Sequence, residues 1–168
     1  RHGDGAPFAG DPRAAAARDE IATGRRAFLG LATELDLQID LDALTAFARW
    51  ITPAFMPRRF DTWFYIALAP PDQLAACDGW ETVDAEWIAP AEALRLADLG
   101  ERKVIFPTRM NLKLLAEGLR AKDAVERAGA RTVVTVEPKL TESPDGRRLV
   151  IPADAGYGEV SELLSRAL

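Results

Sequence analysis

The sequence contains few of the side chains that most often carry covalent or metal chemistry. Among its 168 residues only Cys77 is a cysteine and only His2 is a histidine. A lone cysteine excludes a disulfide within the chain and a cysteine-based zinc site, and it fits a reducing compartment. The one histidine lies in the polar start of the chain, so the sequence argues against Ser, His or Cys catalysis built on a nucleophile and base pair.

Long hydrophobic runs, a secretory leader and an excess of positive charge are also missing. No apolar stretch approaches the roughly 18 to 20 residues that span a bilayer, and the start lacks the order of a secretory signal. Lys and Arg number 21 against 26 Asp and Glu, which gives a formal net charge of -5. Nucleic acids and anionic membranes need a basic excess to bind, so we expect neither as a partner. Local basic clusters could still hold a small phosphate ligand, and together these absences predict a cytoplasmic protein.

What is present fits one ordinary soluble domain over residues 1–168, because 48% of the residues are hydrophobic and 28% are charged. Residues 1–12 form a polar Gly/Asp/Pro stretch that we expect to be disordered. Residues 13–36 are predicted to be helical and to pack on a sheet. Residues 131–168 are expected to form a C-terminal hairpin and tail, which closes a sheet edge or makes a contact in a homodimer. Because the sequence opens on Arg1 and not on Met, we expect it to begin in the middle of a longer protein.

Alternating apolar residues predict three strands in the first half of the chain, at residues 44–52, 60–69 and 81–88. The first ends at Pro53, which cannot donate a ladder hydrogen bond. The second has apolar side chains on both faces, and Trp63 lies on one of them. A strand that is covered on both faces belongs in the interior of a sheet, so 60–69 is predicted to be flanked on both sides.

Helices and a hairpin are predicted in the second half. Helical patterns occur at residues 91–99, 108–119 and 122–128. Pro90 stands at the start of the first of them, where a proline is favourable. Ser143-Pro144-Asp145-Gly146 has the composition of a hairpin turn, between strands predicted at 132–136 and 147–151. Strands and helices alternate without a repeat, which predicts a mixed α/β sandwich.

Short motifs occur in a particular order between residues 50 and 112. They are Trp50-Ile51-Thr52-Pro53, then Arg59-Phe60-Asp61-Thr62 with an aromatic strand, Glu81 to Trp87, Pro90-Ala91-Glu92-Ala93-Leu94, and Pro107-Thr108-Arg109-Met110-Asn111-Leu112. In this order they resemble the Nudix hydrolase superfamily, specifically its coenzyme A diphosphatase branch, which carries a long insertion after the Nudix helix. The resemblance covers about residues 25 to 120, and several ordered motifs are more specific than any one of them. It implies an α/β fold, namely a Nudix-like α/β/α sandwich around a mixed sheet that is incomplete at its N-terminus.

The Nudix box itself is not in this sequence. Ala16 to Glu20 echo its Arg-Glu centre, but Ala22 and Thr23 stand where the family has paired glutamates. In the family those glutamates hold Mg²⁺ (or Mn²⁺), which activates water and neutralises the diphosphate. We favour truncation over decay of the box, because in the family the box ends shortly before the insertion. This chain alone is therefore expected to be inactive.

The resemblance implies that the full-length protein is a magnesium-dependent diphosphatase. Its expected substrate is a nucleoside diphosphate linked to another moiety, with coenzyme A or acyl-CoA preferred. The alternative is a Nudix-like module without a box, which binds a nucleotide or a partner protein and does not turn it over. An upstream coding sequence that contains the box would favour the enzyme, whereas a natural start codon near Arg1 would favour the module.

Glu81 is the candidate catalytic residue within the chain. In the predicted third strand it is in phase with Val83 and Trp87, on the more apolar face. A carboxylate there needs a metal, a cation or a hydrogen bond to offset its desolvation. The functional interpretation makes Glu81 an auxiliary metal ligand or base at the edge of the active site. The alternative is a glutamate at a strand end that reaches solvent.

Arg58, Arg59 and Trp80 are the candidate substrate-binding residues. The two guanidinium groups could hold a diphosphate or a 3′-phosphate through bidentate hydrogen bonds, or they could lie in solvent or pair with Asp61. Trp80 is the best candidate to stack on an adenine. The residues assigned to structural motifs are Asp61, Thr62, Pro107 and Thr108. Asp61 is expected to be partly buried and to pair with Arg49 or Arg59.

Overall fold

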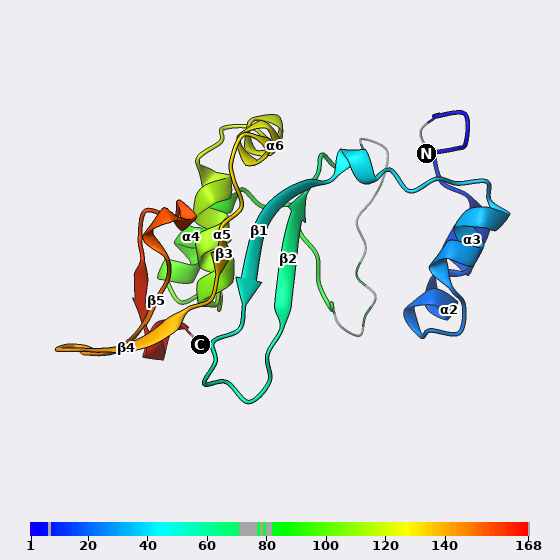
Figure 1. Ribbon diagram of the computed structural model, residues 1–168. Coiled ribbons are helices and arrows are strands. Elements are labelled where there is room, and N and C mark those ends of the chain that lie inside the picture. The colour runs from blue at the N-terminus through cyan, green and yellow to red at the C-terminus, as the bar shows by residue number, and fades with distance from the viewer. Residues whose placement is uncertain (7, 71–76, 78, 80–81, 168) are drawn as a thin grey trace. The chain divides into compact units, whose positions relative to one another are not determined.

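The chain folds into two compact units, which Figure 1 shows as a ribbon. The structure is a computed structural model and describes residues 1–6, 8–70, 77, 79 and 82–167. Unit 1 comprises Arg1–Ala43 and Ala69–Trp87, and unit 2 comprises Leu44–Leu68 and Ile88–Leu168. Within the described ranges, no helix is long and apolar enough to cross a membrane. The whole is a mixed α/β structure with two small sheets, both in unit 2.

Unit 1 is built from short helices. They are α1 Pro12–Ala16, α2 Arg18–Ala22, α3 Phe28–Glu34 and the 3-10 turn η1 Leu41–Ala43. The carboxylate of Asp11 caps α1 by accepting a hydrogen bond from the backbone N–H of Arg13 at 2.7 Å. Three buried residues of this unit, Ala17, Leu31 and Leu35, pack on one another. The helical prediction for 13–36 is thus confirmed, and within unit 1 these helices bury apolar side chains against each other. Their packing on a sheet stays a prediction.

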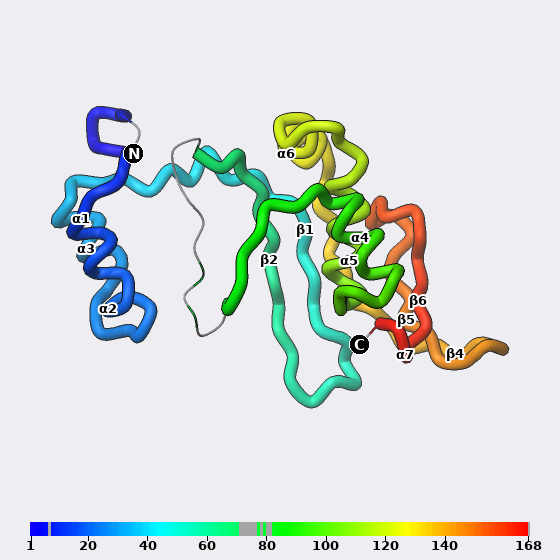
Figure 2. The backbone as a smooth tube through the Cα atoms, turned by 180° about the vertical axis from the view of Figure 1, so that it is seen from behind, coloured from blue at the N-terminus to red at the C-terminus, as the bar shows by residue number. Residues whose placement is uncertain are grey.

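The first sheet of unit 2 has the strand order β2-β1-β3. Its central strand, β1 Thr45–Ile51, pairs antiparallel with β2 Asp61–Ile66 and parallel with β3 Thr135–Val136. The tube in Figure 2 follows β1 into the turn at residues 52–60 and back along β2. The strand predicted at 44–52 and the mixed sheet are therefore confirmed.

The interior position predicted for 60–69 is wrong, because β2 lies at the edge of its sheet. On its outer face Trp63 is 46% exposed and Tyr65 is 57% exposed. These rings stack on each other at 6.4 Å, and the Arg49 guanidinium lies 5.1 Å from the Trp63 ring. Aromatic side chains can thus cover one another at a surface, so an apolar face does not require a covering layer.

The second sheet contains β4 Lys139–Ser143, β5 Gly146–Val150 and β6 Ser161–Leu163, which pair antiparallel in that order. The predicted hairpin turn at 143–146 is confirmed, with Gly146 at φ 122°. The strand predicted before it, at 132–136, is wrong as a hairpin partner. Residues 135–136 pair with β1, and β4 begins only after Pro138, which lacks the N–H that a continuous ladder would need.

The remaining helices of unit 2 are α4 Pro90–Asp98, α5 Phe106–Ala116, α6 Ala121–Gly129 and α7 Leu164–Ala167, and a 3-10 turn η2 spans Ala153–Ala155. The three helices predicted after residue 90 are confirmed. The strand predicted at 81–88 is wrong for residues 82–88, which adopt neither strand nor helix. Val83 and Trp87 are 81% and 78% exposed, so their alternation reflects no buried face.

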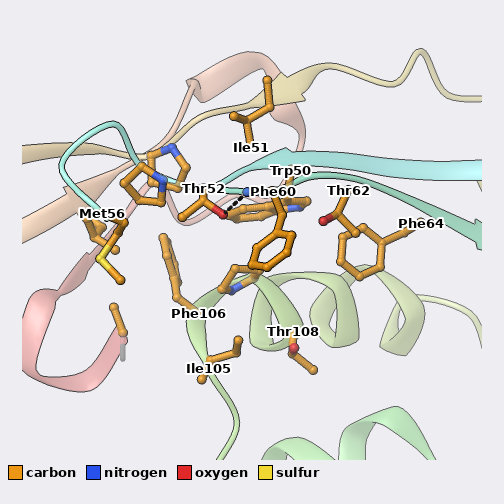
Figure 3. A pocket seen from close by; sticks show the side chains of 15 residues that line it. Trp50, Ile51, Thr52, Met56, Phe60, Thr62, Phe64, Ile105, Phe106 and Thr108 are labelled. Atoms are coloured by element: carbon orange, nitrogen blue, oxygen red, sulfur yellow. Dashed lines mark hydrogen bonds between the residues drawn. The ribbon is translucent and has the colours of Figure 1, made fainter. Parts of the chain in front are cut away.

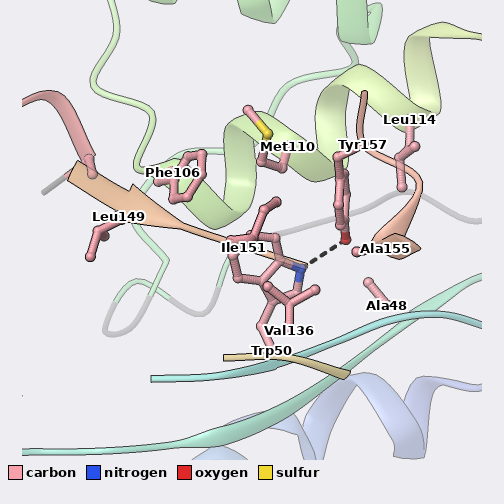
Figure 4. Packing of buried hydrophobic residues seen from close by; sticks show 11 residues of the cluster. Ala48, Trp50, Phe106, Met110, Leu114, Val136, Leu149, Ile151, Ala155 and Tyr157 are labelled. Atoms are coloured by element: carbon pink, nitrogen blue, oxygen red, sulfur yellow. Dashed lines mark hydrogen bonds between the residues drawn. The ribbon is translucent and has the colours of Figure 1, made fainter. Parts of the chain in front are cut away.

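The core of unit 2 joins both sheets to α5 (Figure 4). Its members are Ala48, Trp50, Phe106, Met110, Leu114, Val136, Leu149, Ile151, Ala155, Tyr157 and Ala167. Phe106, Met110 and Val136 are fully buried, and burial of each such side chain contributes about 1.5–3 kcal/mol. Met110 and Leu114 lie on the inward face of α5. This core fixes α5 against β1, which positions the site described next.

Candidate functional site

A cavity of about 300 Å³ lies in unit 2, between β1, β2 and the start of α5 (Figure 3). Three segments that are distant in sequence line it, at residues 50–53, 60–64 and 105–108. Leu149 and Ala167 complete its wall from the C-terminal part of the chain. These three segments coincide with the motifs at Trp50-Pro53, Phe60-Thr62 and Pro107-Thr108, so the fold brings separate sequence signals together at one place.

The turn after β1 shapes one end of the cavity. Pro53 ends the strand, and Thr52 then holds the returning chain by two hydrogen bonds to Phe60. The Thr52 N–H donates to the Phe60 carbonyl at 2.9 Å, and the Phe60 N–H donates to the Thr52 hydroxyl at 3.0 Å. Because a strand alternates its faces, fixing Phe60 also directs Thr62 and Phe64 to the cavity.

A buried chain of hydrogen bonds holds the Trp50 ring in the cavity wall. The Trp50 indole N–H donates to the Tyr157 hydroxyl at 2.9 Å, and that hydroxyl donates to Asn111 Oδ1 at 2.9 Å (Figure 4). The Phe106 ring meets Trp50 edge-on at 5.9 Å. Burial raises the pKa of Tyr157, so the phenol stays protonated and able to donate. Asn111 is 6% exposed, and the described residues offer no partner to its Nδ2.

The cavity is mainly apolar and suits an apolar group with a few polar atoms. Thr62 and Thr108 contribute hydroxyls, and neither hydroxyl has a hydrogen-bond partner among the described residues. Among the residues that the structure describes, no Asp, Glu, His, Lys or Arg side chain lines it. The cavity can therefore bind and orient a ligand, but it holds no general acid, base or metal ligand. Thr62, Pro107 and Thr108, assigned from sequence to structural motifs, all line its wall.

The two arginines before β2 have different surroundings. Arg59 Nε donates to the Thr52 carbonyl at 2.9 Å, and its Nη2 donates to Glu137, so this side chain ties the turn after β1 to the segment after β3. Arg58 lies over the Phe60 ring at 5.9 Å. Their predicted contact with a phosphate stays a prediction.

Asp61 forms a bidentate ion pair with Arg49, one of its two expected partners. Arg49 Nε and Nη2 donate to the two carboxylate oxygens at 2.9 and 2.6 Å. Hydrogen bonding by Arg49 lowers the pKa of Asp61, although the Asp61 side chain remains 47% exposed. The pair joins β1 to β2 on the face of the sheet that points away from the cavity, because Trp50 and Thr62 are opposite each other on the cavity side.

Glu81 and Trp80 lie outside the described residues, so their predicted roles in catalysis, metal binding and adenine stacking stay predictions. Among the described residues, no group of three or more His, Cys, Asp or Glu side chains could hold a metal ion. The described part of the chain therefore does not fit Mg²⁺, and we assign no metal-dependent step to it.

Tyr157 is a site residue that the sequence did not reveal, and Asn111 was identified only as a member of the motif at Pro107 to Leu112. Tyr157 stands between Gly156, which has φ 79°, and Gly158. The positive φ turns the backbone here in a way that a strand or helix does not, and this turn directs the Tyr157 ring. Asn111 follows Met110 on the buried face of α5. Besides that motif, an asparagine in phase with apolar helix positions is a signal for a buried hydrogen-bond network, because a buried amide requires partners.

Comparison with known proteins shows a distant relationship to a human enzyme. No protein-family model matches the chain, and no solved structure gives a significant match. Human acyl-coenzyme A diphosphatase NUDT19 is 28% identical over 171 residues, in an alignment that covers 99% of this chain and 46% of the human protein. The chain is a distant relative of this Nudix hydrolase. It spans about half the length of that curated relative.

Proposed function

We propose that this chain supplies the substrate-binding part of a Nudix-type diphosphatase that acts on coenzyme A conjugates. The observation that carries the proposal is the convergence of the motifs at residues 50–53, 60–64 and 107–108 on one apolar cavity. The distant relationship to human acyl-coenzyme A diphosphatase NUDT19 supports the same reading of those motifs.

The size of the cavity indicates which part of such a substrate it takes. At about 300 Å³ it is at the lower limit for ligand pockets, which is too small for a whole nucleotide conjugate. Its apolar wall favours an acyl chain or a similar apolar group, with the Thr62 and Thr108 hydroxyls available to one polar atom. The nucleotide would then lie outside it.

The chemical step belongs, in this proposal, to a Nudix box that lies in another part of the protein and holds Mg²⁺. The described residues contribute binding and orientation of the substrate. A Nudix-like sandwich, a cytoplasmic location and a dimer contact through residues 131–168 are parts of the same proposal.

The direct test measures binding of lauroyl-coenzyme A to this chain by calorimetry and compares two tryptophan substitutions. Thr108 lies at the cavity, where Thr108→Trp would fill the space, and we expect its dissociation constant to rise by about 10-fold or more. Thr132 is exposed and does not line the cavity, so Thr132→Trp serves as the matched control and should leave binding unchanged.

The outcomes separate the competing functions. Absence of binding to the chain, or equal affinities of the two variants, would overturn the assignment of the cavity. Binding without turnover by a version extended to the natural start codon, in the presence of Mg²⁺, would overturn the enzyme and leave the binding module. Turnover that appears only when a Nudix box is included would support the proposal.

A further inference from the structure

A charged cleft lies beside the apolar cavity in unit 2. It has a volume of about 420 Å³ and is formed by the end of α4, the segment at 100–104, the first turn of α5 and α7. Its charged residues are Asp98, Arg102, Lys103, Arg109, Glu162 and Arg166. Four of these side chains are basic and two are acidic, in a chain whose net charge is -5. A basic concentration of this kind on an acidic protein attracts anions locally.

Part of this positive charge is not neutralised within the protein. Arg109 pairs with Asp98 at 2.5 Å. Lys103 and Arg166 are exposed, and the described residues provide neither of them with a carboxylate partner. Two basic side chains are therefore available to an anion without the loss of an internal ion pair.

The cleft and the cavity share a wall. The segment that lines the cleft at 102–104 continues directly into residues 105–108, which line the cavity, and Arg109 follows at once. At the other end of the chain, Arg166 lines the cleft and its neighbour Ala167 lines the cavity. One ligand can consequently place an apolar group in the cavity and an anionic group in the cleft.

We infer that the cleft binds a terminal phosphomonoester of the ligand whose apolar part occupies the cavity, an inference that rests on the proposed function. A phosphomonoester carries about -1.5 to -2 charges at pH 7, so Lys103 and Arg166 can both contact it, whereas a carboxylate or a phosphodiester carries a single charge. Guanidinium groups fit phosphate oxygens through paired hydrogen bonds, which Arg166 can offer. The site differs from Arg59, whose guanidinium is already bonded to Thr52 and Glu137.

The experiment compares lauroyl-coenzyme A with lauroyl-dephospho-coenzyme A, which lacks the phosphomonoester, as ligands of the chain. The wild-type chain should bind lauroyl-coenzyme A at least about 10-fold more tightly, since a charge-assisted hydrogen bond has that effect on affinity. The double variant Lys103→Gln/Arg166→Gln should abolish this preference and leave the affinity for the dephospho form within about two-fold. The control variant Lys139→Gln/Arg147→Gln also removes two exposed positive charges, but outside the cleft, and should retain the preference.

Two results would overturn the inference. One is a double variant whose affinity falls equally for both ligands or is unchanged for both. The other is inorganic phosphate binding to the cleft as tightly as lauroyl-coenzyme A, which would indicate a free-anion site without a link to the cavity. In either case a loss of affinity in Thr108→Trp would keep the proposed function intact, whereas failure of the wild-type chain to bind either conjugate would overturn the proposed function itself.

Discussion

The two units of this chain differ most in how much apolar surface they bury. Unit 2 packs eleven buried residues into one cluster, whereas the cluster of unit 1 contains three. Both units leave some large side chains in solvent, such as Leu29 at 66% in unit 1 and Leu119 at 98% in unit 2. A small unit has little interior, so helix formation alone gives it little stability. The cavity and the charged cleft both lie in unit 2, where a packed core can hold side chains in fixed positions.

The largest expected effect comes from a cavity in the core of unit 2. Met110 is fully buried, and Met110→Ala should lower the free energy of unfolding by about 2–5 kcal/mol. Hydrogen exchange should accelerate throughout α5 and β1. Leu31→Ala in unit 1 is the matched comparison and should accelerate exchange only within α1 to α3. Equal destabilisation of both units by either substitution would show that they unfold as one cooperative body.

A smaller effect is expected from the buried hydrogen-bond chain. Tyr157→Phe leaves the Trp50 indole N–H and Asn111 Oδ1 without their buried partner, which should cost about 1–3 kcal/mol in urea denaturation. Because the pKa of Tyr157 is raised in the folded protein, its contribution is complete below about pH 10 and is lost as pH rises further. The variant should therefore lack part of the alkaline decline in stability. An identical alkaline profile in the two proteins would contradict this account.

The smallest effect is expected at the surface of unit 2, from the Arg49–Asp61 ion pair. Asp61→Asn keeps the shape of the side chain and removes its charge. Because water screens this exposed pair, the midpoint of urea denaturation should fall only slightly at pH 7. The lowered pKa of Asp61 means that its contribution is present above about pH 4 and disappears as pH falls below it. The two proteins should thus converge in stability near pH 2. A difference that persists there would point to packing and not to charge.

Local signals in the sequence predicted elements whose ends are set by one residue. Pro53 ended β1, Pro90 began α4 and Asp145-Gly146 formed the hairpin turn, because the conformational restrictions of proline and glycine act on their own backbone. The position of β2 in its sheet could not be predicted from a single residue. Its place at the edge depends on β3, which pairs with the opposite side of β1 and comes much later in the chain.

The candidate site was predictable only in part, for the same reason. The motifs at 50–53, 60–62 and 107–108 could be identified, but their convergence on one cavity depends on packing of α5 against β1. Tyr157 could not be connected to Trp50 from sequence, because the two are 107 residues apart. The charged cleft combines Lys103 with Arg166, which no local pattern links.

The parallel pairing of β1 with β3 has a consequence for the protein during its synthesis. Arg49 and Trp50 pair with Thr135 and Val136, and the hydroxyl that accepts from Trp50 is supplied by Tyr157. A chain emerges from the ribosome with its N-terminal end first, so β1 and β2 must wait for most of the molecule before their inner face is covered. During that interval Trp50 and Phe64 offer apolar surface to chaperones or to other nascent chains.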